Sequence, residues 1–308
     1  MLPIAVGTTV HDTVPVPASP YILAAGSHLS LVNVVDGFVS QFPQVHHSPT
    51  SSVDLFGDGL VSANANIISL WDFDTAKVVK STRIRNDDVN DSMVSVRFIN
   101  QNLVAAAGTN RYLNLYDVRT PNISRVYKVQ TCPDNITTLR CCDDTVFCGS
   151  ADGTVVSIDL RQDDLQTLKF KDPLLDFHIP STSLMVGLHE SSHVSIVNPA
   201  TATVLNSYGR PGRATGKLQY HIKCAWDQQD IVCGTETGTI LRFSWEPTTN
   251  MILTSPAIVV GTGVVNCVAF VGEFVVGFSE GWLHRFPRRP DLSRLQRDRD
   301  SNFHQHPL

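Results

Sequence analysis

The sequence predicts an all-β fold, a seven-bladed β-propeller of four-stranded antiparallel blades, and three observations support this prediction. A pattern of two apolar runs recurs along the chain at intervals of about 40–45 residues, the period of a propeller blade. The runs are rich in aliphatic, aromatic and β-branched residues, as strands are. No segment shows helical periodicity long enough to compete with this interpretation.

The number of blades follows from the spacing of the repeat. Each copy has an apolar run ending in a small residue, a tight polar turn, and a second run ending about ten positions further on. The small residues are Gly26, Ser62, Gly108, Gly149, Gly187, Gly234 and Gly277, and the second anchors are Asp36, Asp72, Asp117, Asp159, Asn198, Ser244 and Pro287. Successive second anchors are 36, 45, 42, 39, 46 and 43 residues apart, so the chain holds seven units.

The turns inside the units carry hairpin signals. In the fourth unit, Asp152-Gly153 separates the strand-like segments 145–149 and 154–158. Glycine supplies the positive φ that such a turn needs. Thr237-Gly238 and Glu280-Gly281 occupy the matching positions of the sixth and seventh units, which predicts the same turn in each.

The ends of the repeat predict how the propeller closes. The seventh unit offers three strand-like segments, 264–271, 273–278 and 282–286, whereas segment 2–8 precedes the first unit without a partner. Pairing segment 2–8 with the last blade removes two exposed sheet edges, so we predict closure by the N-terminal strand. We assign residues 1–290 to the propeller and 291–308, which is charged and poor in apolar residues, to a disordered tail or short exposed helix.

Composition excludes several classes of protein. The net charge of −5 argues against a general or sequence-specific nucleic-acid binder and against an acidic-membrane binder. No apolar run reaches the ~18 residues that span a bilayer, and the first residues lack the basic region of a secretory signal. The seven cysteines are an odd number and four lie in strand-like runs, which predicts free thiols in the cytoplasm or the nucleus.

Residues that could carry chemistry lack the required spacing. Cys141, Cys142 and Cys148 do not form a zinc pattern and are expected to be buried strand residues. His46-His47 lies in a Pro- and Ser-rich loop, where an exposed pair is expected. Segment 209–217 is rich in glycine and basic residues but lacks the Gly-Lys-Ser/Thr ending of a phosphate loop. We therefore predict no catalytic residues, no cofactor, no metal and no small-molecule substrate.

One candidate binding surface is the loop that contains this segment. Arg210, Arg213 and Lys217 fall between the outer strand of the fifth blade and the inner strand of the sixth. They would form a cationic patch suited to an acidic or phosphorylated partner protein. The alternative is a solvated loop without a partner.

Four residue groups resemble the WD-repeat family over roughly residues 11–287. Trp71-Asp72 matches the dipeptide that names the family, Tyr116-Asp117 and Ile158-Asp159 are degenerate copies, and segment 149–153 is similar to the family's second-strand turn. The resemblance implies a propeller that docks other proteins. Because no Gly-His pair opens a blade, the family's His–Ser–Trp–Asp hydrogen-bond tetrad is largely absent, and we expect less rigid blades.

A second candidate surface follows from this resemblance, on the opposite face. Arg119 and Arg161 each stand two residues past a third strand. Their segments resemble the Trp/Tyr-Asp-x-Arg box of propellers that act as substrate receptors of cullin ubiquitin ligases, although Asn110 and Ile158 depart from the longer pattern. These arginines could otherwise serve as surface hydrogen-bond donors.

Shorter segments resemble particular propeller groups. Segment 261–270 is similar to the start of the last blade in the mitogen-activated protein kinase organizer family, which implies splicing or kinase signalling as the setting. Segment 117–121 resembles the mitotic checkpoint and messenger-RNA export group. Our leading hypothesis is a non-catalytic scaffold subunit of an intracellular complex, and the alternatives are a cullin substrate receptor or a checkpoint or export propeller.

Overall fold

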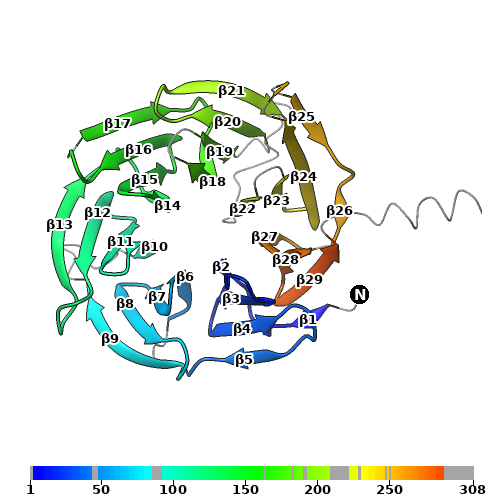
Figure 1. Ribbon diagram of the computed structural model, residues 1–308. Helices are drawn as coiled ribbons and strands as arrows, with labels where there is room; N and C mark the ends of the chain where they lie inside the picture. The colour runs from blue at the N-terminus through cyan, green and yellow to red at the C-terminus, as the bar shows by residue number, and fades with distance from the viewer. Residues whose placement is uncertain are drawn as a thin grey trace, which may run out of the picture.

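Seven antiparallel sheets surround a central axis, as Figure 1 shows for this computed structural model. The structure describes residues 3–43, 48–84, 92–162, 164–181, 184–189, 193–208, 222–227, 230–246, 248–249, 251–261 and 263–287. We refer to the strands of each blade as A to D from the axis outward. The seven-bladed, all-β prediction is confirmed.

The first four blades follow one another along the chain, each with four strands in the order A to D. Blade 1 contains β2 (Asp12–Pro15), β3 (Tyr21–Ala25), β4 (Leu29–Asn33) and β5 (Val39–Gln41). Blade 2 contains β6 (Thr50–Phe56), β7 (Gly59–Asn64), β8 (Ile67–Asp72) and β9 (Lys77–Arg83). Blade 3 contains β10 (Met93–Asn100), β11 (Leu103–Gly108), β12 (Tyr112–Asp117) and β13 (Ser124–Gln130). Blade 4 contains β14 (Ile136–Cys142), β15 (Thr145–Ser150), β16 (Thr154–Asp159) and β17 (Asp164–Lys169).

The last three blades complete the ring. Blade 5 contains β18 (Leu174–Ser181), β19 (Leu184–His189), β20 (Val194–Asn198) and β21 (Thr203–Tyr208). Blade 6 contains β22 (Cys224–Asp227), β23 (Asp230–Gly234), β24 (Thr239–Glu246) and β25 (Met251–Thr254), and a short extra strand, β26 (Ile258–Val259), also pairs with β24. Blade 7 contains β27 (Val265–Val271), β28 (Phe274–Ser279), β29 (Trp282–Pro287) and, from the other end of the chain, β1 (Ile4–Ala5).

The N-terminal strand closes the ring, as predicted. In β1, Ile4 pairs with Leu283 and Ala5 with Trp282 of β29. The N–H groups of Val6 and Gly7 both donate to the carbonyl of Gly281, at 2.8 and 3.0 Å. Ile4 and Val6 are buried in a cluster shared by blades 7 and 1. Closure therefore rests on apolar burial as well as on strand pairing.

The core lies between the blades, because every sheet presents both faces to a neighbour. Strand B, the second from the axis, is buried along almost its whole length, as in β7 and β11. Outer strands alternate instead between half-buried and exposed residues, as β9 does from Lys77 to Arg83. This change from continuous to alternating apolar character is expected when the outer strand has one face in water.

The turns divide into two opposite faces of the disc. Turns that join strands A to B and C to D lie at one end of every blade, which we name the A–B face. Turns that join B to C lie at the other end, the B–C face, together with the described parts of the D-to-A connections between blades. The predicted Asp152-Gly153 turn is on the B–C face, where Gly153 has φ of +84° and a Cβ would lie 2.6 Å from the carbonyl oxygen of Asp172. Gly238 and Gly281 also have positive φ, at +74° and +83°.

All seven cysteines are free thiols, in agreement with the prediction. Cys148 is buried in β15, and Cys141 and Cys142 are half-buried in β14. Burial raises the pKa of each of these thiols. All three are strand residues, as expected, but only Cys148 is fully buried. Residues 288–308, including the predicted tail, lie outside the described part of the chain, as does His46-His47.

Candidate functional site: the central channel and the two faces

Hydrogen bonds near the axis join each blade to the next. Most of them involve residues at one equivalent register position in strand A of the seven blades: Asp12, Ser52, Ser95, Thr138, Asp176, Cys224 and Cys267. We call them the inner ring. Their side chains are short and mostly polar, so they can reach the backbone of the neighbouring strand A without filling the channel.

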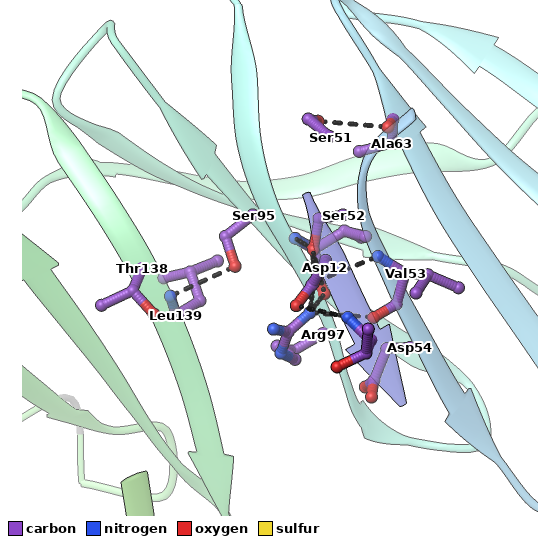
Figure 2. A network of polar contacts seen from close by, with 12 residues as sticks. Asp12, Ser51, Ser52, Val53, Asp54, Ala63, Ser95, Arg97, Thr138 and Leu139 are labelled. Carbon is purple, nitrogen blue, oxygen red and sulfur yellow. Dashed lines mark hydrogen bonds and ion pairs between the residues drawn. The ribbon is translucent and has the colours of Figure 1, made fainter. Parts of the chain in front are cut away.

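Each seam between blades has a bond at this level. Asp12 accepts from Val53 N–H at 3.3 Å, Ser52 from Val96 N–H at 3.2 Å and Ser95 from Leu139 N–H at 3.2 Å. Figure 2 shows these contacts around Asp12 and Ser95. Thr138 donates to Asp176 at 2.9 Å, and Asp176 accepts from Cys224 N–H at 3.0 Å. The last two seams are closed by Lys223 N–H to the carbonyl of Asn266 at 2.8 Å and by Cys267 Sγ to the carbonyl of Val10 at 3.6 Å.

An ion pair spans the first three blades. Arg97 of β10 extends its guanidinium to Asp12 Oδ2 of β2 at 2.9 Å and to Ser52 Oγ of β6 at 2.8 Å (Figure 2). The same nitrogen lies 3.0 Å from the Val53 carbonyl oxygen and 2.7 Å from that of Val96. Burial alone would raise the pKa of Asp12, but the Arg97 charge beside it holds this pKa well below its usual value. Asp12 is therefore ionised, and its carboxylate contacts residues of two other blades.

A second ion pair links blades 4 and 5. Arg140 Nη2 contacts both carboxylate oxygens of Asp176, at 2.9 and 3.1 Å. Burial opposes ionisation of Asp176, but Arg140 and then Lys223 lower its pKa below the usual value. Lys223 is 8% exposed and its charge also acts on Asp12. Cations and carboxylates thus balance one another around the axis, as buried charges must.

The part of the channel nearest the A–B face is a cavity of about 450 Å³. One wall is polar, with Asp54, Arg97, Arg140 and His178 from blades 2 to 5. Blades 6, 7 and 1 supply a mainly apolar wall that includes Trp226 and Ala269. Burial raises the pKa of Asp54 and lowers that of His178 to about 4, so His178 is neutral near pH 7. Ion pairs of Arg97 and Arg140 from this wall join strand A of one blade to strand A of another.

Arg119 and Arg161 lie where the sequence predicts, on adjacent blades of the A–B face. Their side chains are 68% and 73% exposed. Arg119 forms an ion pair with Asp117 of its own turn, at 2.6 Å, and hydrogen bonds from Arg119 hold the pKa of Asp117 at about 2. Arg161 pairs with Asp144, in the A–B turn of the same blade. The structure brings both arginines to one surface, with each held by a neighbouring carboxylate.

The other predicted surface is the basic segment between blades 5 and 6. Arg210, Arg213 and Lys217 lie outside the described residues. The strands on either side are those expected, because the segment follows β21 at the outside of blade 5 and precedes β22 at the axis of blade 6. β21 ends and β22 begins at the end of their blades that carries the B–C face, opposite Arg119 and Arg161.

The sequence did not predict the inner ring or the exposed acidic side chains of the A–B face. The ring was detectable in principle, because small polar residues recur near the start of each strand A with the period of the blade. The pairing of Arg97 with Asp12 was not detectable, because 85 residues separate them and no motif joins them.

Across the described residues, no group of three or more His, Cys, Asp or Glu side chains could hold a metal ion. None of the described segments forms a helix long and apolar enough to cross a membrane.

Comparisons with known proteins agree with this architecture. No family model matches the chain. An uncharacterized WD repeat-containing protein of Schizosaccharomyces pombe is 24% identical over 173 residues, which are 54% of this chain and 55% of that protein. The chain thus spans about half the length of the curated relative it matches.

Two solved structures share the fold. The structure of U3-55K superposes with a TM-score of 0.78 at 14% identity, covering 91% of this chain and 96% of that one. The WD40 repeats of RRP9 give a TM-score of 0.77 at 14% identity, with 91% and 94% covered. The fold is therefore that of WD40 propellers. None of the three names refers to the kinase organizer group, so that narrower resemblance gains no support.

Proposed function

We propose that this protein is a non-catalytic scaffold that holds other proteins on the faces of a rigid propeller, as a subunit of a multi-protein complex inside the cell. The observation that carries the proposal is the distribution of its charges. Near the axis, Arg97 and Arg140 are paired with carboxylates across blade seams. On the turns, charged side chains such as Arg119 and Arg161 are exposed and held in place. Surface loops on a rigid scaffold are where binding residues concentrate.

The finer setting rests on sequence resemblance alone. Segment 261–270 favours splicing or kinase signalling, in the nucleus or the cytoplasm. In this setting, the segment with Arg210, Arg213 and Lys217 would contact an acidic or phosphorylated partner on the B–C face.

A second candidate is a substrate receptor of a cullin ubiquitin ligase. The observation in its favour is that Arg119 and Arg161 are exposed on the same face of neighbouring blades. Their ion pairs with Asp117 and Asp144 fix the guanidinium groups at the rim, where an adaptor could reach them. Such exposed pairs add little to stability, so removing the arginines should leave the fold intact.

One purification experiment separates these candidates. The tagged full chain is expressed in cells, and its partners are quantified by mass spectrometry. We compare wild type with a loop variant (R210A/R213A/K217A) and a rim variant (R119A/R161A). A control variant, R83A/R125A, removes two exposed arginines from the outer strands β9 and β13.

The scaffold proposal predicts stoichiometric partners that the control variant retains and the loop variant loses. The loss should be larger at low ionic strength, because salt screens exposed charges. Loss of cullin adaptor peptides from the rim variant alone would instead identify the ligase receptor. A wild-type chain that purifies without any stoichiometric partner would contradict both.

A further inference from the structure

An apolar groove crosses the A–B face between blades 1 and 7. It encloses about 560 Å³ between the A–B turn of blade 1, residues 16–20, and the A–B turn of blade 7. Val16, Pro17 and Pro20 form one side, and Phe274 lies on the other. Val35, from the C–D turn of blade 1, lines the groove and is 57% exposed. Contiguous exposed apolar surface of this kind is typical of a binding groove.

The walls of the groove are held in place before anything binds. Ser19 Oγ donates to the carbonyl of Val16 at 2.9 Å and accepts from the N–H of Tyr21 at 3.3 Å, which fixes the proline-rich turn. Arg285 of β29 reaches across the blade seam and donates to the carbonyls of Val34 and Val35. A preformed groove loses little conformational freedom on binding, so an apolar ligand retains more of its interaction free energy.

The face around the groove is acidic. Exposed acids on its described turns and adjoining strand ends are Asp36, Asp58, Asp72, Asp74, Asp143, Asp164, Glu246 and Glu273. The exposed bases of those same described segments, Lys77, Arg119 and Arg161, belong to blades 2, 3 and 4. Glu273 lines the groove itself, and Asp36 follows Val35 directly. A ligand that carries positive charge beside apolar side chains complements this surface.

The groove also meets the channel. Pro15 and Phe270 line both cavities, so the two join where strand A of blades 1 and 7 reaches the A–B face. Asp227 lines the channel. An occupant that follows the whole path must therefore be extended and longer than a single side chain. A segment of polypeptide has that shape.

We propose that this groove binds an extended segment of a partner protein, with apolar side chains between the two turns and a lysine or arginine beside Glu273. The inference rests on the proposed scaffold function and adds the surface and the class of peptide. The acidic face steers the basic segment toward the groove, and the apolar contacts hold it there.

The test begins with the full-length chain as bait for a phage-displayed library of random peptides. Selected peptides are synthesised with a fluorescent label, and their affinities are measured by fluorescence anisotropy. Two variants probe the groove, Val35→Ser and Glu273→Lys. Two matched controls lie elsewhere: Val126→Ser, an equally exposed valine (57%) on β13, and Glu280→Lys, an exposed acid of the same blade on the B–C face.

The proposal predicts that selected peptides combine apolar residues with lysine or arginine. Val35→Ser should weaken them by about fivefold, and Glu273→Lys by roughly tenfold at low salt and less at high salt. The two control variants should bind as wild type does. Exchanging the peptide's basic residue for glutamate should restore binding to the Glu273→Lys variant, which a merely structural role for Glu273 would not produce.

The proposal is overturned if no peptide is selected, if the selected peptides are acidic, or if the groove variants bind them like wild type. The same four variants are then compared in the cellular purification. Partners retained by both groove variants would refute the groove and leave the scaffold function standing. A wild-type chain without partners would refute the scaffold function itself.

Discussion

Replacing Arg97 with methionine should destabilise the propeller by about 3–5 kcal/mol, because it leaves the Asp12 carboxylate buried without its cation. Arg97 and Asp12 have side chains that are 9% and 4% exposed, and their contact is 2.9 Å. The substitution also removes the guanidinium contacts to Ser52 and to two backbone carbonyls. Methionine fills a similar volume, so the loss is electrostatic rather than a cavity effect.

The lower end of that range applies here. Asp12 keeps its hydrogen bonds from Ser52 Oγ, at 2.7 Å, and from Val53 N–H, at 3.3 Å. The Lys223 charge also remains nearby. For a chain of this size, a loss of about 3 kcal/mol corresponds to a fall in Tm of roughly 6 °C.

The pH dependence follows from the sign of the pKa shift. In the wild type, the pKa of Asp12 is lower in the folded than in the unfolded state, so its stabilising effect is present above the unfolded value and is lost as pH falls through the folded value. Without Arg97, burial raises that pKa instead. The deficit of the variant should therefore be largest near pH 7 and should shrink as pH falls, and adding Asp12→Asn should recover part of it.

Thermal unfolding followed by tryptophan fluorescence measures these differences. Arg125→Met, an exposed position on β13, is the control and should melt like wild type. If Arg97→Met melts within about 1 °C of wild type at pH 7, then the axial ion pair does not hold the blades together and the reasoning fails.

Three further predictions concern the fold. Deleting residues 1–8 exposes the edge of β29 and removes two buried side chains, so Tm should fall by more than about 5 °C, and an unchanged Tm would contradict closure by β1. Trp71→Phe removes the 2.8 Å bond from Nε1 to Ser62 Oγ and should cost about 1 kcal/mol by chemical denaturation, whereas the same substitution in a Ser62→Ala background should cost less. His178 and His189 have pKa values of about 4 in the folded state, below the unfolded value of 6.5. The free energy of unfolding should therefore fall by about 2 kcal/mol for each group as pH drops from 6.5 to 5. If His→Gln variants keep the wild-type dependence of this free energy on pH, the prediction is wrong.

The architecture was predictable because the spacing of the repeated anchor residues determines the number of blades. The seven anchors at intervals of 36 to 46 residues correspond to the seven blades, and the turn glycines Gly153, Gly238 and Gly281 have the positive φ that the hairpins require. The short β26 strand was not predicted. It consists of only two residues, Ile258–Val259, and exists because β24 is long enough to pair with two partners.

The hydrogen bonds between blades were not predictable from the sequence. Loss of the His–Ser–Trp–Asp tetrad predicts less rigid blades, although blade 2 retains the Trp71–Ser62 bond. The inner ring supplies hydrogen bonds at six of the seven seams, and a backbone bond from Lys223 to Asn266 joins the seventh. These bonds depend on which strands are adjacent in three dimensions, as between Asp12 and Arg97, and no local pattern encodes that adjacency. Arg119 and Arg161 were predictable because they occupy a fixed offset from a strand end.

Hydrogen–deuterium exchange of the chain, free and bound to the most abundant partner from the wild-type purification, tests the central claim most directly. A docking scaffold predicts slower exchange in the turns of one face, with the strands near the axis unchanged between the two states. On the A–B face, the protected turns should include residues 16–20, 34–35 and 271–274, which line the groove. Exchange that slows in no turn, or that changes throughout the inner strands, would contradict a partner held on the surface of a rigid propeller.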